Sequence, residues 1–481
     1  MKRTLLLVLP APDESVSARI KYALFPPLGL LTIAGLTPPE RYEMRLIDEF
    51  AWSEAAPPEA DLVAMTVCAS TASRAYRLAD DYRRRGGKVV LGGIHPTALP
   101  DEAARHADAV CIGPAEPVWP QVIRDFEAGS LQRFYRADRA GTAALMPVPR
   151  RDLISRHRYL VPDTMVATRG CPHACEFCYK ASFWGRRFYE CRAAAAVERE
   201  LAMLPGHCVF MLDDNLLGNR QHAREIFAVL RASGKIWQAG ASLDAARVPG
   251  YLEDAYDSGC RSLFVGFESL SPENLRSANK PVNLAADYAA AIRRFHDAGI
   301  MINASFVFGF DHDGRDVFDR TLDFAIVNKL ETATFHILTP FPGTRTFDRM
   351  QAEGRLLHRD WRFYDAHHAV FRPARLTPEQ LEEGQRRAYR EFYSCRSIAA
   401  RSLGMPAALK RALYNIAWKK VDWLWEPVIR WGVLAYARPA FEFVLARNTR
   451  PGVGRGEPCV RPDVPADEGT APVTTRAAAR S

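Results

Sequence analysis

The stretch TRGCPHACEFCYK, residues 168–180, contains three cysteines in a C-x-x-x-C-x-x-C spacing, namely Cys171, Cys175 and Cys178. It directly follows DTMVATR (163–169), an apolar run that predicts a buried strand, so the thiols stand at the carboxyl end of that strand. Three thiolates that hold a four-iron cluster leave one iron without a protein ligand, and a small molecule is then free to chelate it. The alternatives are a zinc site with His173 as the fourth ligand and three incidental thiols.

A series of alternating strands and helices begins at residue 161 and ends near residue 345. Its apolar runs predict strands over 163–169, 208–213, 237–242, 261–268, 301–309 and 332–338, with helical patterns between them. Six β/α units are too few for an eight-stranded barrel and predict an open, partial (β/α)6 TIM barrel over residues 161–345. By analogy with complete barrels, the chemistry is expected at the carboxyl ends of the strands, where the cysteines stand.

Residues 1–130 predict a separate α/β domain. Its apolar runs predict strands over 4–10, 44–48, 60–68, 88–93 and 107–113, with helices over 72–85 and 117–127. This alternation predicts a parallel sheet of flavodoxin-like (Rossmann-like) type with helices on both faces. The chain lacks a G-x-G-x-x-G or Walker-type loop, so a dinucleotide or P-loop ligand is not expected. Residues 131–160 have no clean periodicity and predict a linker.

Residues 346–447 predict a helical region with an unusual composition. Between residues 396 and 447 nine Lys and Arg stand against three Asp and Glu, so this segment has most of the formal net charge of +8. The rest of the chain is nearly neutral, and a nucleic-acid partner is therefore not expected. Four of the nine tryptophans also lie here, at Trp418, Trp423, Trp425 and Trp431.

The basic, Trp-rich stretch 405–447 has two interpretations. It is either a helical pair packed on the barrel or a peripheral contact with a membrane interface. Pro427, Gly432 and Pro439 interrupt it, which argues against a transmembrane helix. The last residues, 448–481, are rich in Gly, Pro, Ala and Thr and predict a disordered tail.

The remaining cysteines and the first residues bear on location. Seven of the ten cysteines are scattered singly, which is not the pattern of a disulfide framework. The apolar run in MKRTLLLVLPAPDESV is shorter than the roughly 7–15 residues of a signal peptide's core, and acidic residues follow it. We therefore expect a first strand there, and a cytoplasmic protein that lies at most peripherally on the inner face of the membrane.

The segment Cys171-x-x-x-Cys175-x-Phe177-Cys178 resembles the signature of radical S-adenosylmethionine (SAM) enzymes, which have a (β/α)6 partial barrel. The resemblance implies a [4Fe-4S] cluster whose open iron is chelated by SAM. An electron from a donor such as flavodoxin or ferredoxin then cleaves SAM to a 5′-deoxyadenosyl radical. It further implies SAM contacts from Phe177, Tyr179, Asp213, Asp214, Ser242, Glu268 and Pro340. Helix capping is the alternative for the two aspartates, and a structural salt bridge is the alternative for Glu268.

Residues 25–31, 46–49 and 92–97 resemble the branch of radical SAM proteins that has a cobalamin-binding domain. That branch includes the anaerobic magnesium-protoporphyrin ester cyclase, hopanoid methylases and cobalamin-dependent methyltransferases, and the similarity covers about residues 1–400. It implies a corrin between the two domains, with contacts from Thr66, Gly92, Gly93, His95 and Glu116. The Asp-x-His-x-x-Gly loop of other cobalamin domains is absent, and Gly113-Pro114-Ala115-Glu116 stands where relatives usually have Gly-Glu-Gly/Ala-Glu, so Pro114 removes a carboxylate and a backbone donor. A domain that serves only as a scaffold is the alternative, as is a plain strand-end histidine for His95.

The resemblance implies three possible functions. The first is a methyltransferase, in which the radical removes a hydrogen atom from an unactivated carbon and cobalamin provides the methyl group. The second is oxidation or cyclisation with the same cofactors and no methyl transfer. The third is a non-catalytic cobalamin- or cluster-binding sensor. The substrate is expected to be a small molecule or a lipid, and the sequence assigns no catalytic residue beyond the cofactor ligands.

Overall fold

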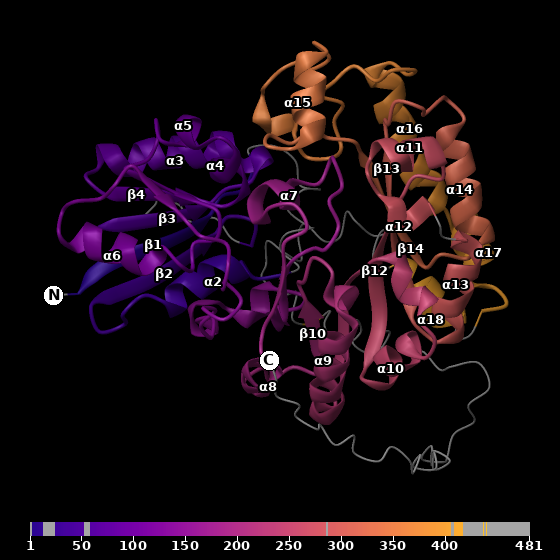
Figure 1. The fold of residues 1–481 in the computed structure, drawn as a ribbon, viewed down its shortest axis with the longest axis horizontal. Helices are drawn as coiled ribbons and strands as arrows, with labels where there is room; N and C mark the ends of the chain where they lie inside the picture. Colours follow the sequence, from indigo (N-terminus) through magenta and orange to yellow (C-terminus); the bar gives the residue numbers. More distant parts are fainter. Residues whose placement is uncertain are drawn as a thin grey trace, which may run out of the picture.

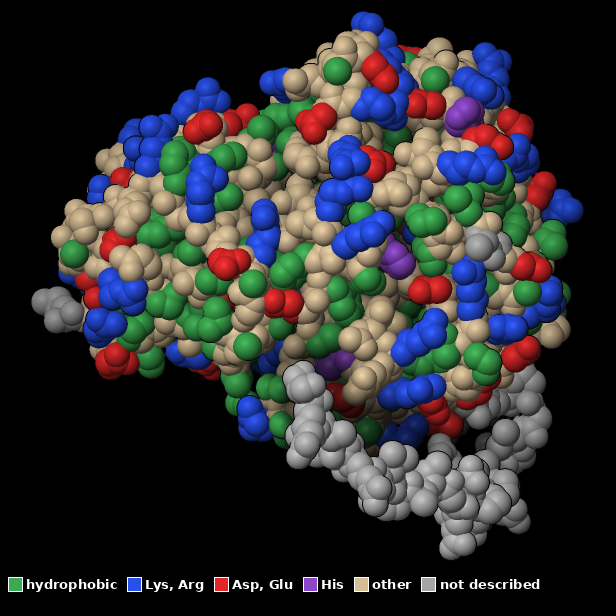
Figure 2. Space-filling view, in the orientation of Figure 1, with side chains coloured by type: hydrophobic (Ala, Val, Ile, Leu, Met, Phe, Trp, Pro, Cys, Tyr) green, Lys and Arg blue, Asp and Glu red, His purple; other side chains and the backbone are tan. Residues whose placement is uncertain are grey.

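The structure, a computed structural model, describes residues 2–12, 25–51, 58–284, 287–405 and 408–416, together with the isolated positions 436 and 439. Figure 1 shows two lobes side by side, an N-terminal α/β domain and a barrel, with α15 (Arg345–Ala352) above their junction. On the face shown in Figure 2, Lys and Arg side chains are interspersed with Asp and Glu.

The N-terminal domain contains a six-stranded parallel sheet in the order β2-β1-β3-β4-β5-β6. The strands are β1 (Arg3–Leu9), β2 (Tyr42–Asp48), β3 (Leu62–Thr66), β4 (Lys88–Gly92), β5 (Ala109–Ile112) and β6 (Phe134–Arg136). The order of the first five strands is that of flavodoxin-like folds, so the predicted fold class is confirmed. The sequence did not predict β6, which lies inside the stretch expected to be a linker.

Helices cover both faces of this sheet, as a parallel sheet requires. One face packs on α2 (Leu28–Gly35) and α6 (Trp119–Glu127), and the other packs on α3 (Ala72–Arg84). The core on the α3 side of the sheet also includes Phe347 of α15 and Trp361. The segment after the barrel therefore completes the core of the N-terminal domain and ties the two lobes together.

Asp48, at the end of β2, is buried beneath the segment that joins the two lobes. The Tyr159 hydroxyl donates to its carboxylate at 2.9 Å and the Phe50 backbone N–H donates at 3.0 Å. Burial nevertheless raises the pKa of Asp48 from 3.8 to about 7. The folded protein therefore keeps this carboxyl protonated at pH values where the unfolded chain ionises it.

We expect Asp48→Asn to change how stability depends on pH. A raised folded-state pKa contributes stability that is complete below about pH 4 and is lost as the pH rises through 7. From pH 5 to pH 8 the unfolding free energy of the wild type should fall by about 2–3 kcal/mol relative to the Asn variant. Urea titrations at both pH values measure this, with the exposed Asp101→Asn as control. Parallel pH profiles for wild type and Asp48→Asn would contradict the prediction.

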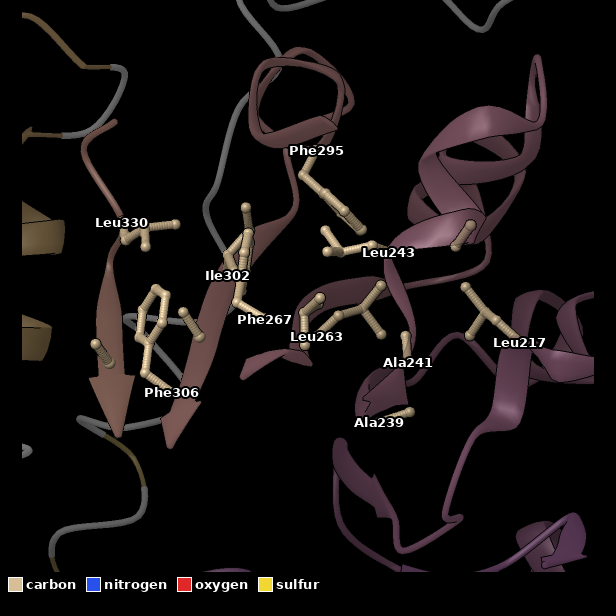
Figure 3. Packing of buried hydrophobic residues seen from close by; sticks show 14 of the residues in the cluster. Leu217, Ala239, Ala241, Leu243, Leu263, Phe267, Phe295, Ile302, Phe306 and Leu330 are labelled. Carbon is tan, nitrogen blue, oxygen red and sulfur yellow. The ribbon is translucent and has the colours of Figure 1, made fainter. Parts of the chain in front are cut away.

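The barrel contains six parallel strands that follow one another in chain order, from β7 at one edge to β14 at the other. They are β7 (Thr164–Met165), β10 (Cys208–Met211), β11 (Ile236–Ala241), β12 (Cys260–Glu268), β13 (Met301–Phe308) and β14 (Thr332–Ile337). The outer helices are α8 (Ala194–Ala202), α9 (Arg220–Ser233), α10 (Tyr251–Asp257), α11 (Pro272–Ser277), α12 (Pro281–Leu284), α13 (Tyr288–Asp297) and α14 (Val317–Val327). Apolar side chains from strands and helices form the core between them (Figure 3). The predicted partial barrel is confirmed.

The first barrel strand is shorter than the sequence predicts. Only Thr164 and Met165 pair in the barrel sheet, while β8 (Thr168–Gly170) turns away and pairs antiparallel with β9 (Tyr189–Cys191). Gly170 has a φ of +80°, and a Cβ there would lie 2.2 Å from the Phe188 carbonyl oxygen. A side chain at Gly170 would therefore break the hairpin from which the cysteine loop starts.

The helical C-terminal region is confirmed as far as the structure describes it, with α16 (Pro378–Phe392), α17 (Cys395–Ser402) and α18 (Ala408–Asn415). The buried Arg401 guanidinium fixes it to the barrel by donating to the carbonyls of Leu330, Glu331 and Phe392. The four tryptophans and the predicted disordered tail lie outside the described residues. Within the described residues, no helix has the length and apolar character needed to cross a bilayer.

Candidate active site at the junction of the two domains

The three cysteines lie on the loop between β8 and α7 (Tyr179–Trp184), and each is partly buried. The loop is held from the barrel side, because Glu176 donates its N–H to the Ala278 carbonyl at 3.0 Å and Asn279 Nδ2 donates to the Ala174 carbonyl at 2.9 Å. Burial raises the pKa of all three thiols, that of Cys175 to about 12. Without bound metal these thiols are therefore neutral at physiological pH.

The donor set fits an iron–sulfur cluster. Each thiolate of a four-iron cluster binds a different iron, so the three side chains need not meet at one point. Among the described residues, no three His, Cys, Asp or Glu side chains are grouped to hold a single ion. His173, the candidate fourth zinc ligand, is instead engaged through Nε2 with Ser242 Oγ at 3.3 Å.

Two lysines, the half-buried Lys180 and the buried Lys280, flank the cysteine loop, and each pairs with a carboxylate predicted to contact SAM. Lys180 lies 2.5 Å from Asp214, and Lys280 lies 2.5 Å from Glu268. The charge of Lys280 acts on Cys175 and that of Lys180 acts on Cys178. The structural salt bridge considered for Glu268 is present, and each ammonium group lies beside the cysteines together with its paired carboxylate, whose charge acts in the opposite direction.

Asp213, which follows β10, is hydrogen-bonded to the chain just before the cysteine loop. Its carboxylate accepts hydrogen bonds from the backbone N–H groups of Ala167 (3.0 Å) and Thr168 (2.6 Å) and from the Thr168 hydroxyl (2.5 Å). Burial raises its pKa to about 6. Asp213 therefore positions the start of β8, and hence the cysteine loop, while its predicted contact with SAM stays a prediction.

Ser242, at the end of β11, lies at the centre of a polar network. Its hydroxyl donates to Asp244 and accepts from Asn215 Nδ2 at 3.1 Å, while His173 approaches from the cysteine loop. Asn215 Oδ1 is buried without a hydrogen-bond partner among the described residues. Asn215 follows Asp213 and Asp214 after β10, and this unmet acceptor adds it to the candidate site.

The aromatic residues of the motif are held by rings from two other loops. The Phe177 and Phe310 ring centroids lie 5.9 Å apart, and those of Tyr179 and Phe341 lie 5.7 Å apart. Pro340, the last predicted SAM contact, is buried next to Phe341 in the loop after β14. The sequence did not predict the part played by Phe310.

The predicted cobalamin contacts Thr66, Gly92 and Gly93 lie together at the carboxyl ends of β3 and β4. Gly93 has a φ of +102°, and a Cβ there would lie 2.8 Å from the Val67 backbone N and 2.9 Å from Thr66 Oγ1. Packing within the domain is therefore enough to explain why position 93 is a glycine. A Cβ on Gly92 would make an ordinary 3.6 Å contact with Cys111.

His95 lies inside a buried cluster. It is 1% exposed, its Nε2 lies 3.2 Å from a Glu102 oxygen, and Trp361 Nε1 donates to the same oxygen at 2.9 Å. The His95 and Trp361 ring centroids lie 5.1 Å apart, so His95 also packs on the segment after the barrel. Its Nδ1 atom is buried without a hydrogen-bond partner among the described residues.

Glu116 makes a contact between the two domains. Its carboxylate pairs with Arg169, two residues before the first cysteine of the motif, and both side chains are largely buried. The Arg169 guanidinium also lies 5.3 Å from the Trp184 ring centroid of α7. The sequence singled out Glu116 but not its partner.

The geometry of this junction fits a ligand between the domains. In a flavodoxin-like sheet the ligand crevice lies at the strand ends between β1 and β3, and the loops after β1 and β2 continue into residues outside those described. Helix α7, which begins at the last cysteine, packs on α4 (Ile94–Ala98) of the N-terminal domain (Figure 1). Arg169 Nε and His95 Nδ1 are buried near this boundary without partners in the described part of the chain, so polar groups remain available for a cofactor.

Comparisons with known proteins agree with this geometry. Residues 165–325 match the radical SAM superfamily, and residues 21–123 match the B12 binding domain. The bacteriochlorophyllide d C-12(1)-methyltransferase of Chlorobaculum tepidum is 33% identical over 398 residues, which cover 79% of this chain and 85% of that protein. The bacteriochlorophyllide d C-8(2)-methyltransferase of the same organism is 29% identical, covering 82% of this chain and 90% of that protein.

A solved structure shares the whole architecture. The cobalamin-dependent S-adenosylmethionine radical enzyme OxsB, with aqua-cobalamin and SAM bound, superposes with a TM-score of 0.63 at 13% identity, over 94% of this chain and 77% of that one. This likeness concerns the fold, while the sequence matches establish the relationship. The chain belongs to the radical SAM superfamily, in the branch of enzymes with an N-terminal B12-binding domain that use a [4Fe-4S] cluster, SAM and cobalamin.

Proposed function

We propose that this enzyme transfers a methyl group to an unactivated carbon of a tetrapyrrole. The observation that supports this proposal is the 33% identity to a bacteriochlorophyllide methyltransferase along 85% of its length, with the cysteine loop and the N-terminal domain both present. A second bacteriochlorophyllide methyltransferase matches over a similar span. In both relatives the name specifies methyl transfer to a peripheral carbon.

Different residues at the junction would have different roles in this reaction. Cys171, Cys175 and Cys178 would hold the cluster, with the Lys180 and Lys280 ammonium groups beside it to stabilise its negative charge. When bound, the cluster and SAM supply a radical that removes a hydrogen atom, and cobalamin supplies the methyl group. Aromatic packing around the loop and the domain contact through Arg169 would keep water away from the reacting carbon.

The other predicted SAM and cobalamin contacts are proposals, and some of them have more support than others. Ser242 with Asn215, and the rings of Phe177 and Tyr179, line the approach to the cysteine loop and fit SAM contacts. Asp214 and Glu268 would affect SAM binding indirectly, by holding Lys180 and Lys280 in place beside the cysteine loop. On the N-terminal side the cobalamin contact would rely on the strand ends at Thr66 and Gly92, with Gly93, His95 and Glu116 shaping the surface around them.

A second candidate reaction uses the same cofactors without methyl transfer. The anaerobic magnesium-protoporphyrin IX monomethyl ester cyclase of Cereibacter sphaeroides is 25% identical over 365 residues, which cover 69% of this chain and 56% of that protein. Its name also specifies a tetrapyrrole substrate, so the class of substrate is the same under both reactions. The lower identity and coverage favour methyl transfer.

The experiment that tests the proposal is anaerobic turnover with a tetrapyrrole and with a lipid. The reconstituted enzyme is incubated with SAM and a one-electron donor of flavodoxin or ferredoxin type, which we propose as the physiological reductant. Chlorophyllide a and the hopanoid diploptene serve as the two probes. A methylated chlorophyllide product supports the proposal, whereas methylation of diploptene alone would reject the tetrapyrrole assignment.

We also propose a peripheral contact with an anionic membrane surface, starting at α18. Leu409, Leu413 and Ile416 are spaced four and three residues apart and form an exposed apolar stripe, with Leu409 73% exposed. The opposite face of the helix is polar and buried, since Arg411 pairs with Glu331 and Asn415 Oδ1 accepts from Arg401. This arrangement is the reverse of an ordinary surface helix. The basic, Trp-rich sequence that follows is of the kind that binds anionic interfaces.

We expect the double variant Leu409→Glu/Leu413→Glu to lose vesicle binding by about tenfold or more, because each change removes apolar burial and adds repulsion from an anionic surface. Flotation with phosphatidylcholine vesicles, with and without phosphatidylglycerol, measures it. Leu357→Glu changes a residue exposed elsewhere and is the matched control. Equal flotation of all three proteins would reject the membrane contact.

A further inference from the structure

The barrel strands have two faces of opposite character. Side chains that alternate along β11, β12 and β13 pack outward against the helices, among them Ala239, Leu263, Phe267, Ile302 and Phe306 (Figure 3). Because neighbouring residues of a strand point to opposite faces, the side chains between them face the inside of the barrel. We call four such side chains the inner face, namely Phe210 of β10, Gln238 of β11, Phe264 of β12 and Asn303 of β13.

The members of the inner face are neighbours across adjacent strands. Phe210 of β10 is in register with Gln238 of β11, and Phe264 of β12 is in register with Asn303 of β13. Gln238 pairs with Ser262, so Phe264 lies two residues further along β12 and is a diagonal neighbour of Gln238 on the same face. The four side chains therefore form one continuous surface across the middle of the sheet.

Two amides on this surface have unmet hydrogen-bonding groups. Gln238 is only 6% exposed, and its Nε2 donor has no partner among the described residues. The Oδ1 acceptor of Asn303 is likewise buried without a partner there. Folding normally avoids such groups because each loses its bonds to water and gains none in return. A donor and an acceptor on two strands are thus left for a ligand.

Phe264 is unusually open for its position. It lies in the middle of a strand that is paired on both sides, yet its side chain is 39% exposed. Phe210 is met by Phe25, with ring centroids 4.5 Å apart. Phe25 comes from the N-terminal domain, so that domain contributes an aromatic ring beside the inner face. The surface therefore offers aromatic rings together with one free donor and one free acceptor.

We infer that the inner face binds the macrocycle of the substrate. This inference rests on the proposed tetrapyrrole methyltransferase function and adds the residues that would select the substrate class. A flat aromatic macrocycle stacks on the Phe264 ring, a peripheral carbonyl accepts from Gln238 Nε2, and a peripheral hydroxyl donates to Asn303 Oδ1. The fused rings of a hopanoid have neither a donor nor an acceptor and would leave both amides unmet.

The position along the strand fits this assignment. Phe264 precedes Glu268, at the carboxyl end of β12, by four residues, or about 13 Å at the rise of a strand. Glu268 pairs with Lys280, whose charge acts on Cys175. A macrocycle of roughly that width, resting on the inner face, would present its rim to the strand ends where the cysteine loop lies.

The test measures probe binding rather than turnover. Enzyme loaded with cluster and cobalamin is titrated without reductant with bacteriochlorophyllide d, whose hydroxyethyl group provides the donor for Asn303, and quenching of the pigment's fluorescence gives Kd. We expect Phe264→Ala, Gln238→Met and Asn303→Leu each to weaken binding by about tenfold. Cluster content, cobalamin content and SAM binding should stay at the wild-type level. Leu357→Ala, at a side chain 40% exposed outside the barrel sheet, is the matched control.

Each outcome separates this inference from the proposed function. If the wild type methylates chlorophyllide and the three variants bind bacteriochlorophyllide d as tightly as the wild type, the inner-face assignment is overturned and the function stands. If the wild type binds diploptene and neither pigment, both are overturned. Should Phe264→Ala fail to load its cofactors, Phe264→Leu replaces it, because it keeps most of the volume and loses only the aromatic face.

Discussion

Cys175→Ala should abolish SAM cleavage, with a loss of roughly three orders of magnitude or more, since the chemistry depends on a complete set of cluster ligands. Two thiolates do not hold a four-iron cluster whose remaining iron must stay open for SAM. Burial raises the pKa of the Cys175 thiol to about 12, so only metal binding makes this side chain a thiolate at neutral pH. The variant should therefore also lose the iron and the brown colour of the reconstituted protein.

The control for this experiment is Cys191→Ala. Cys191 is also partly buried, and it lies on β9, the strand paired with the one that leads into the cysteine loop. It is outside the motif and should keep its iron content and its 5′-deoxyadenosine production. A Cys175→Ala protein that still produces 5′-deoxyadenosine at the wild-type rate would contradict the assignment of the cluster ligands.

Breaking the Glu116–Arg169 pair should cost more stability than any surface change. The two side chains are 8% and 16% exposed, and removing one partner of a buried ion pair leaves the other charge unpaired. We expect Arg169→Met and Glu116→Gln each to lower the free energy of unfolding by about 3–5 kcal/mol. The double variant should lose less than the sum of the two, because removing both charges also removes the unpaired one.

The same double-mutant cycle can also be measured through catalysis. Arg169 stands two residues before Cys171, and Glu116 belongs to the cobalamin-binding domain, so the pair links the two cofactor sites. We expect methyl transfer to fall further than SAM cleavage in both single variants. Urea unfolding of the protein before reconstitution measures stability. The amount of methylated product relative to cleaved SAM measures how much further methyl transfer falls than SAM cleavage. Single variants within 0.5 kcal/mol of the wild type, the range of ordinary surface changes, would show that the pair does not hold the domains together.

Much of the fold follows from the sequence because buried parallel strands are continuous apolar runs. Runs such as 88–93 and 301–309 coincide with β4 and β13. β6 was not predicted, since it has only three residues, at the edge of the sheet and partly exposed. The first barrel strand was predicted too long, because a hydrophobic run does not show where the chain leaves one sheet for a hairpin.

The candidate site was predictable where a motif is local in the chain and not where it is assembled from distant parts. The three cysteines stand within a few residues, so their spacing alone indicates a cluster. The partner of Glu116 comes from the barrel, and the Trp361 ring that packs on His95 comes from the segment after it, so no spacing rule predicts either contact. Asp213 was predicted to contact SAM from its place at a strand end, and its hydrogen bonds to the backbone of Ala167 and Thr168 likewise join segments that are distant in the chain.

The central claim, that this is a radical SAM methyltransferase that uses cobalamin, is tested most directly by the products of SAM. Anaerobic enzyme with its cluster and cobalamin is given SAM labelled with deuterium in the methyl group, together with a reductant and chlorophyllide a. We predict equal amounts of S-adenosylhomocysteine and 5′-deoxyadenosine, with the labelled methyl group in the pigment. Formation of 5′-deoxyadenosine alone, with no label in the pigment, would contradict methyl transfer and favour oxidation or cyclisation.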